Sequence, residues 1–162
     1  ATLQESKRVP LHSFFYPLDS IRHWNRLYGR RGFLQYQFVL PKDGSREGLE
    51  QIHQRVAESG RGSFLGVLKL FGGENANHLS FPIEGYTMAL DFAFHRKLLP
   101  LLAELDQLVV GRQGRLYLSK DARMSREVFR QGYPRWEEFL SLRERHGMAA
   151  KFQSLQSKRL GI

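Results

Sequence analysis

Apolar residues recur along the chain with two different periods, and the change of period marks the predicted elements. Residues 33–40 and 86–93 alternate between two sets of side chains, as half-buried strands do, and residues 63–71 and 115–119 resemble them. Two segments between these strands carry apolar residues at helical spacing instead. They are marked by Leu49, Ile52 and Val56, and by Leu98, Leu101, Leu105 and Leu108.

The middle of the chain is therefore expected to run strand, helix, strand, strand, helix, strand. This βαββαβ order predicts an α+β fold, a ferredoxin-like antiparallel sheet with helices on one face. Another helix is expected after Pro17, where Leu18, Ile21, Trp24 and Leu27 recur. Ser45 is a possible cap of the helix before Gly60. Two short C-terminal helices are expected at residues 125–130, capped by Ser125, and 134–145.

Alternation along the strands assigns side chains to the two faces of the sheet. The apolar set, expected under the helices, is Leu34, Tyr36, Phe38 and Leu40 in one strand and Tyr86, Met88, Leu90 and Phe92 in another. The opposite face then receives Gln35, Gln37, Thr87, Ala89 and Asp91. Lys69 shares its side of residues 63–71 with Val67 and Phe71. This polar face is either an ordinary solvated surface or the cover of a polar ligand.

Composition narrows the function classes only modestly. The formal net charge of +9 favours an anionic partner, although a plain solvated basic surface explains it equally well, and no long run of like charges suggests a nucleic-acid arm. The absence of cysteine excludes disulfides and thiolate metal sites. No apolar stretch is long enough to predict a membrane span, and residues 1–10 do not resemble a signal peptide.

Residues 114–121 carry the most suggestive local chemistry. They place the phenol of Tyr117 and the ammonium of Lys120 three residues apart at the end of a predicted strand. The six histidines are dispersed, so no metal site is predicted, and no phosphate loop or nucleophile elbow occurs. Arg31, Gly32 and Phe33 match part of an RNA-recognition signature, but the strand is the first rather than the third of the domain. Locally, an ordinary strand end and a site both remain open.

Several longer motifs, in order along the chain, resemble the C-terminal part of a known family. They include Phe15-Tyr16-Pro17-Leu18-Asp19, Gly32-Phe33-Leu34-Gln35-Tyr36-Gln37-Phe38-Val39, Leu68-Lys69-Leu70-Phe71-Gly72, Leu79-Ser80-Phe81-Pro82, Gly114-Arg115-Leu116-Tyr117, Lys120-Asp121 and Tyr133-Pro134-Arg135. The family is the FAD-linked oxidases of the vanillyl-alcohol oxidase superfamily, in particular its sugar oxidases. The resemblance covers the chain from about Phe14 to Leu160.

The resemblance implies that this chain acts together with an N-terminal part of the protein that has no counterpart in this sequence. Residues 1–111 are expected to be the substrate-binding (cap) region, and residues 112–162 a C-terminal segment that packs on an N-terminal FAD-binding domain. FAD would be bound without a covalent link and mostly by that domain, so this chain alone is expected to be inactive.

The family's site positions carry over one residue at a time. Lys120 and Tyr117 match the lysine and tyrosine of its Tyr-x-x-Lys-Asp motif and are expected to be catalytic and to contact the flavin. The expected substrate-binding residues are Gln35, Gln37, Lys69, Phe71, Thr87 and Ala89. Thr87 and Ala89 replace an asparagine and a cysteine of mycobacterial members, so substrate preference is expected to differ and thiol-directed covalent inhibitors to fail.

The implied activity is oxidation of a sugar secondary hydroxyl by hydride transfer to flavin. The implied partners are a sugar or polyprenyl-phospho-sugar substrate and the FAD domain, with no nucleic acid. The implied location is the cytoplasm, with peripheral membrane contact where the substrate is lipid-linked. Two other interpretations stay open: a non-catalytic ferredoxin-like module, RNA-binding or regulatory, and a relative that has lost its oxidase activity and serves as a partner.

Overall fold

The computed structural model describes residues 8–23, 26 and 28–162, and its sheet carries the predicted ferredoxin-like order. Its elements are α1 (Leu11–Phe15), the 3-10 helix η1 (Pro17–Ser20), β1 (Phe33–Pro41), α2 (Ser45–Glu58), β2 (Leu65–Phe71), β3 (Gly85–Ala93), α3 (Leu98–Gly111), β4 (Arg115–Leu116), α4 (Arg126–Gly132), α5 (Trp136–Arg145), α6 (Met148–Lys151) and α7 (Leu155–Leu160).

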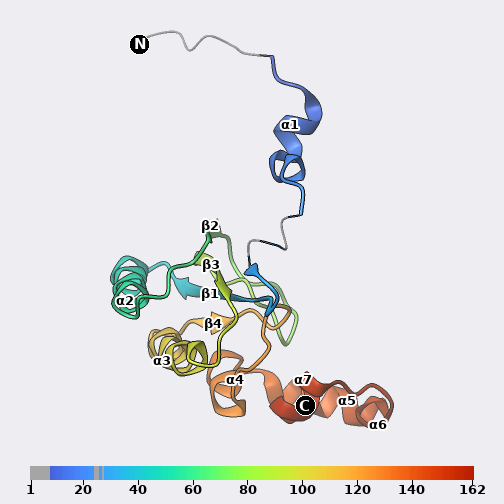
Figure 1. Ribbon diagram of the computed structural model, residues 1–162. Helices are drawn as coiled ribbons and strands as arrows, with labels where there is room; N and C mark the ends of the chain where they lie inside the picture. Colours follow the sequence, from blue (N-terminus) through green and yellow to red (C-terminus); the bar gives the residue numbers. More distant parts are fainter. Residues whose placement is uncertain (1–7, 24–25, 27) are drawn as a thin grey trace, which may run out of the picture.

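The four strands form one antiparallel sheet in the order β2-β3-β1-β4. The two strands of each strand–helix–strand unit are not neighbours in the sheet; a strand of the other unit lies between them. This is the split βαβ arrangement. Helices α2 and α3 lie side by side on one face of the sheet (Figure 1). The predicted α+β fold class is confirmed.

The core lies between the sheet and these helices, as the alternation along the strands predicted. Tyr36, Phe38 and Leu40 of β1 are buried there, together with Met88, Leu90 and Phe92 of β3. They meet the apolar stripes of α2 and α3, namely Ile52, Val56, Leu98, Leu101, Leu102, Leu105 and Val109. Burial of these side chains supplies the main stabilisation of the fold.

The segment after α3 packs on the same core. Met124, Val128, Phe129 and Leu160 are all buried in it. The hydroxyl of Tyr133 donates a 2.6 Å hydrogen bond to the carbonyl of Leu116, which ties the end of α4 to β4. Residues 112–162 therefore contribute one strand and part of the core to this body. Their packing on an FAD domain, and the proposed boundary after residue 111, stay predictions.

Strand β4 is shorter than the predicted 115–119. It enters the sheet at Gly114, where an added Cβ would lie 2.5 Å from the carbonyl oxygen of Val39, so only glycine allows this approach. The amide of Tyr117 still donates to the carbonyl of Gln37, at 2.9 Å. The next backbone hydrogen bond closes a turn instead: the amide of Lys120 donates to the carbonyl of Tyr117. The chain therefore leaves the sheet at Tyr117.

The predicted helix over Leu18 to Leu27 is wrong where the structure describes it. Residues 17–20 form the 3-10 helix η1 and residues 21–23 a turn, while Trp24 and Leu27 lie outside the described residues. In Figure 1, α1 and η1 stand apart from the sheet and its helices. Their apolar side chains are exposed, so no packed face stabilises a longer helix there.

The helix ends also differ in part from the prediction. Ser125 caps α4 as expected, because its hydroxyl accepts from the amide of Val128 at 3.2 Å. Ser45 is not a cap; it is the first residue of α2, and Gly44 with φ of 73° precedes it. Two C-terminal helices were expected where four are present, because α6 and α7 are too short to show a clear apolar period.

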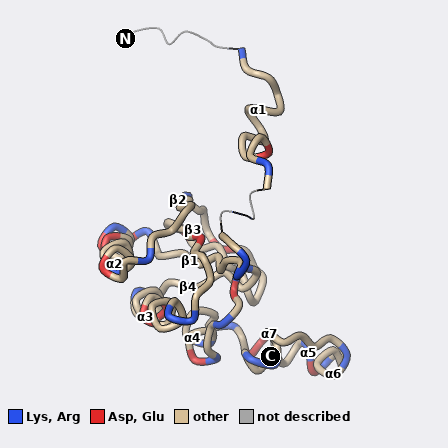
Figure 2. The backbone as a smooth tube through the Cα atoms, viewed as in Figure 1, with Lys and Arg blue, Asp and Glu red and all other residues tan. Residues whose placement is uncertain are grey.

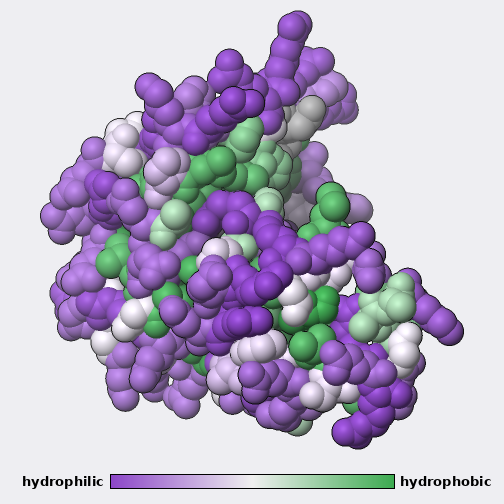
Figure 3. Space-filling view, turned by 90° about the horizontal axis from the view of Figure 1, so that it is seen from below, coloured by the Kyte–Doolittle hydropathy of each residue, from purple (hydrophilic) through white to green (hydrophobic). Residues whose placement is uncertain are grey.

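Charged side chains of both signs are spread over the described part of the chain (Figure 2). Lys and Arg occur from the N-terminal segment through α2 to the C-terminal helices, with acidic residues between them (Figure 2). Seen from below, this face is largely hydrophilic, with apolar side chains gathered in several areas between the hydrophilic ones (Figure 3). Within residues 8–23, 26 and 28–162, no helix is both long and apolar enough to cross a membrane.

Candidate functional site

The sheet face away from α2 and α3 presents most of the predicted site residues. Gln37 of β1 lies opposite Ala89 of β3, and Ala89 lies opposite Val67 of β2. Lys69 lies opposite Thr87 in the same way. Because paired residues in an antiparallel sheet point to the same side, these side chains share one face, as the alternation predicted.

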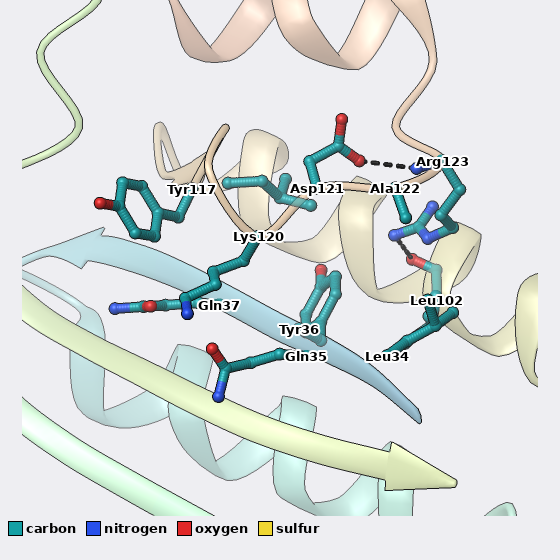
Figure 4. Close-up of a pocket in the computed structure, with 11 residues that line it drawn as sticks. Leu34, Gln35, Tyr36, Gln37, Leu102, Tyr117, Lys120, Asp121, Ala122 and Arg123 are labelled. Carbon is teal, nitrogen blue, oxygen red and sulfur yellow. Dashed lines mark hydrogen bonds between the residues drawn. The ribbon is translucent and has the colours of Figure 1, made fainter. Parts of the chain in front are cut away.

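Tyr117 and Lys120 reach this face from the loop that follows β4. Because β4 pairs only with Phe38 and Val39, the first half of β1 has β3 on one side and no strand on the other, and residues 117–123 cover that free edge. A small cavity of about 20 Å³, the size of a water molecule, lies between loop and strand. Its lining includes Gln35, Gln37, Tyr117 and Lys120. Lys120 extends from the loop toward Gln37 (Figure 4).

Asp121 fixes the loop immediately after Lys120. Its Oδ1 accepts from the amides of Arg123 (2.8 Å) and Met124 (2.7 Å). Its Oδ2 accepts from the guanidinium of Arg159 on α7, an ion pair in which the Asp121 side chain is only 3% exposed. Gln156 donates to the Leu118 carbonyl at 2.7 Å. The last helix of the chain therefore holds the loop that carries the predicted catalytic lysine.

A buried ion pair lies behind this loop. Arg123 donates two 2.6 Å hydrogen bonds to the two oxygens of Asp106, and a third, of 3.1 Å, to the Leu102 carbonyl. The Tyr36 hydroxyl donates to Asp106 at 3.1 Å. Burial raises the pKa of Asp106 above its ordinary value although Arg123 opposes the shift, and burial also raises the pKa of Tyr36. Arg123 thus joins the site loop to α3.

Hydrogen bonds orient both predicted glutamines. The amide of Gln37 donates to the hydroxyl of Thr87 at 3.2 Å, and that hydroxyl donates to the Phe38 carbonyl at 2.8 Å. The amide of Gln35 donates to Asp91 at 2.7 Å. Thr87 is buried, so its role in this structure is to position Gln37 rather than to meet a ligand directly.

An aromatic row links Phe71 to Tyr117. The ring of Phe81 stacks on Tyr117 with centroids 4.4 Å apart and meets Phe71 edge-on at 5.7 Å. Such pairs favour these offset and edge-on geometries. Phe71 of β2 and Tyr117 of the loop after β4 are therefore part of one wall.

Sequence reasoning did not assign a site role to Phe81 or Asp91. Phe81 lies in a polar loop, where a large aromatic residue within one of the family-like motifs was an available signal. Asp91 was placed on the polar face by alternation, but its partners could not be inferred, since Gln35 and Tyr28 both donate to it from β1 and from the preceding segment.

The predicted residues form two groups. Gln35, Gln37, Tyr117 and Lys120 surround the cavity. Lys69 stands on β2, two strand spacings or about 10 Å from β1. A ligand that touches both Lys69 and Lys120 must therefore span the open face of the sheet.

This face carries positive charge that could meet an anionic or electron-accepting group. Lys69 and Lys120 are exposed, and neither ammonium has an ion pair with a carboxylate of the described residues. Gln37 adds an amide and Ala89 leaves the face low in relief between them. In the part of the chain that the structure describes, no cluster of three or more His, Asp or Glu side chains could hold a metal ion.

The Thr87 hydroxyl predicts a measurable effect on stability. Thr87→Val is expected to lower the free energy of unfolding by about 1 to 2 kcal/mol, because the buried hydroxyl bonds both Phe38 and Gln37. Urea denaturation of the variant measures this loss. Thr87→Ser keeps the hydroxyl and is the matched control; an equal loss in both variants would contradict the hydrogen-bond explanation.

Comparison with known proteins supports the resemblance seen in the motifs. The chain is 42% identical to the decaprenylphosphoryl-beta-D-ribose oxidase of Mycolicibacterium smegmatis. The similarity extends over 152 residues, which are 94% of this chain. It is 34% identical over 120 residues, 74% of the chain, to an uncharacterized protein in the mprA 5′ region of Streptomyces coelicolor. No family model matches the chain.

The chain spans about a third of the length of these relatives, 33% in both cases. The predicted resemblance to a sugar oxidase is confirmed at this level, since the similarity extends over nearly the whole chain and only part of the oxidase. The roles of individual site residues are not tested by these comparisons.

Proposed function

We propose that this chain is the substrate-facing part of an FAD-dependent oxidoreductase that oxidises a secondary hydroxyl of a sugar or polyprenyl-phospho-sugar. The similarity to a ribose oxidase supports the reaction class. The observation that carries the proposal is the convergence of Lys120, Tyr117 and Gln37 on the open face of the sheet. The FAD itself would be held mostly by a domain outside this chain.

The residues divide the chemistry among them. Oxidation of a secondary alcohol to a ketone removes a hydride from carbon and a proton from the hydroxyl. FAD, when bound, supplies the hydride acceptor. The Lys120 ammonium stabilises the negative charge that develops on the substrate oxygen. Tyr117 orients the substrate hydroxyl and takes part in moving its proton.

The remaining positions bind the substrate. Gln37, oriented by Thr87, and Lys69 would hold sugar hydroxyls or a phosphate. Phe71, through Phe81, supports the ring of Tyr117. Ala89 leaves space between the polar groups, so its size is expected to influence which sugar fits.

The Lys120 side chain is expected to be required for flavin reduction. In a full-length protein that includes the FAD domain, Lys120→Ala should slow reduction by the sugar substrate about 100-fold or more, the usual cost of removing one charge-stabilising donor. Stopped-flow absorbance of the oxidised flavin measures the rate. Reduction at a near-normal rate in Lys120→Ala would contradict the catalytic role proposed for Lys120.

Two variants make this result specific. Lys120→Arg retains the positive charge and should recover part of the rate. Lys151→Ala on α6 removes the same charge away from the site and should leave the rate unchanged. A full-length protein that binds no flavin at all would instead favour the alternative of a non-catalytic ferredoxin-like module.

A further inference from the structure

A buried carboxylate lies beneath the polar face of the sheet. Asp91 of β3 is 4% exposed and pairs with Gln35 of β1 across the antiparallel ladder. Among residues 8–23, 26 and 28–162, it has no ion pair with a cationic side chain. A buried anion without a cation needs hydrogen-bond donors for its oxygens. The donors of Asp91 therefore determine how its neighbours are oriented.

Two neutral side chains supply these donors. The hydroxyl of Tyr28 donates to Oδ2 of Asp91 at 2.8 Å, and the amide nitrogen of Gln35 donates to Oδ1 at 2.7 Å. A carboxylate accepts hydrogen bonds and cannot donate them. The nitrogen end of the Gln35 amide must therefore face Asp91, and its oxygen end is turned away. In Figure 4 that oxygen lies on the side of the amide toward Lys120.

The second glutamine of the face is oriented by the same rule. The Thr87 hydroxyl has one proton, which it donates to the Phe38 carbonyl at 2.8 Å. Toward Gln37 this hydroxyl can only accept, and it does so from the amide nitrogen at 3.2 Å. Within the described part of the chain, neither the Gln35 nor the Gln37 side-chain oxygen accepts a hydrogen bond. Both oxygens are left for a ligand.

Asp91 does not line either cavity beside it. A larger hollow, of about 540 Å³, lies where β1 begins and β3 ends. Three guanidinium groups border it, those of Arg30, Arg31 and Arg61. Tyr28 lines this hollow, whereas Gln35 lines the cavity at Lys120. A ligand in the Lys120 cavity would therefore meet Gln35 directly, and Asp91 would act on the ligand only through Gln35.

We propose that Asp91 is a positioning residue, a role that rests on the proposed function. With Thr87 it holds both glutamine oxygens outward, so the site face recognises the protons of substrate hydroxyl groups. Gln35 and Gln37 are two residues apart on one strand, about 7 Å, and can serve two hydroxyls of one sugar. A hydroxyl can donate to a glutamine oxygen while it accepts from the Lys120 ammonium.

The same orientation distinguishes the alcohol from its oxidation product. A ketone oxygen has no proton, so it cannot donate to a glutamine oxygen and brings two acceptors together instead. The ketone should therefore bind at least about fivefold more weakly than the alcohol. This difference favours release of the product.

Fluorinated ligands test the proposed recognition, because a fluorine is close to a hydroxyl in size but carries no proton. The probes are farnesylphosphoryl-β-D-ribose and its 2-deoxy-2-fluoro and 3-deoxy-3-fluoro forms. They are titrated calorimetrically into the full-length protein with its FAD domain, with the flavin reduced beforehand so that no turnover occurs. At least one fluoro form should bind about fivefold or more weakly than the parent ester. Equal affinity for all three would overturn the proposal.

Variants of Asp91 show whether it sets this fluoro penalty. Asp91→Leu has an apolar side chain of similar shape and frees Gln35 to turn its nitrogen toward the ligand. The penalty of at least one fluoro form should then fall below about twofold, whereas a purely structural role would weaken all three probes alike. Asp91→Asn keeps an oxygen for Gln35 and should retain the penalty. Unchanged penalties in Asp91→Leu would overturn the proposal.

Thr87 supplies an independent comparison that holds even where Asp91→Leu does not fold. Thr87→Val should lower the penalty of one fluoro form, and Thr87→Ser should retain it. Ser63→Ala is the matched control, because the Ser63 hydroxyl accepts from the backbone amide of Asp91 at 2.9 Å and does not touch its carboxylate. It should leave both penalties unchanged. Loss of the penalty in Ser63→Ala, or its full retention in Thr87→Val, counts against the proposal.

Flavin reduction by the unmodified ester tests the proposed function separately. A protein that discriminates the fluoro forms but does not reduce its flavin would keep the role of Asp91 and reject the oxidation. Normal reduction with equal binding of all three probes would keep the oxidation and reject the role of Asp91. Binding of none of the probes would reject both.

Discussion

Arg123→Ala is expected to lower the free energy of unfolding by about 3 to 5 kcal/mol, the typical cost of breaking one side of a buried ion pair. The Asp106 side chain is only 3% exposed and accepts two of its hydrogen bonds from Arg123. Without the guanidinium, an uncompensated carboxylate would remain in the core beside Tyr36. Denaturation by guanidinium chloride at neutral pH measures the loss.

The loss in Arg123→Ala should depend on pH in a particular direction. Burial already raises the pKa of folded Asp106 above its unfolded value, and removing Arg123 raises it further. A group with a raised folded pKa destabilises the protein as it ionises, so the penalty grows as the pH rises through that pKa. The destabilisation should therefore shrink when the pH is lowered toward the ordinary carboxyl range.

Two further variants separate the ion pair from general effects of substitution. Arg55→Ala breaks the Arg55–Glu104 pair, whose side chains are 41% and 50% exposed, and should cost less than about 1 kcal/mol. The double variant Arg123→Met with Asp106→Leu removes both charges and should be clearly more stable than Arg123→Ala. A double variant as unstable as the single one would show that packing, and not the unpaired charge, causes the loss.

Asp121→Ala is the second substitution with a large expected effect, about 3 kcal/mol of unfolding free energy. It removes the acceptor of two backbone amides, those of Arg123 and Met124, and the partner of Arg159. The Nε of Arg159 already has no hydrogen-bond partner, so the guanidinium would lose its remaining contact at the site. Thermal and urea denaturation measure the change.

The same substitution should also affect the site, because Asp121 directly follows Lys120. Release of the loop from α7 is expected to slow flavin reduction in the full-length protein even at temperatures where the variant is folded. Asp121→Asn retains an oxygen for the two amides and should lose about half as much stability. Asp43→Ala, an exposed aspartate before α2, is the control; an equal effect on rate would rule out a specific role for Asp121.

Local sequence was sufficient to predict the sheet and its two faces because burial follows alternation directly. A one-residue shift of β1 would have exchanged Tyr36 and Phe38 for Gln35 and Gln37 in the core, so the register was strongly determined. The prediction failed where nothing packs: residues 17–23 have an apolar period but no partner surface, and they form a 3-10 helix and a turn. It also failed for α6 and α7, which are too short for a period.

The grouping of the candidate site residues was predicted in part, and their roles stay predictions. The motif around Tyr117 and Lys120 and the glutamines of β1 were assigned from the resemblance, and the structure brings those four residues to one cavity. Lys69 and Phe71 come from the far strand, so their distance from Lys120 depends on strand order. Phe81 and Asp91 needed the tertiary contacts, because their partners are distant in the sequence.

By itself the sequence determined the α+β class, the strand order along the chain and the polar set on one sheet face, since each depends on periods of two and 3.6 residues. Only the tertiary structure decided that β4 stops after Leu116, that α7 holds the Lys120 loop through Asp121, and that Arg30, Arg31 and Arg61 meet around one hollow. These features depend on contacts between distant segments, which the pattern of neighbouring residues does not encode.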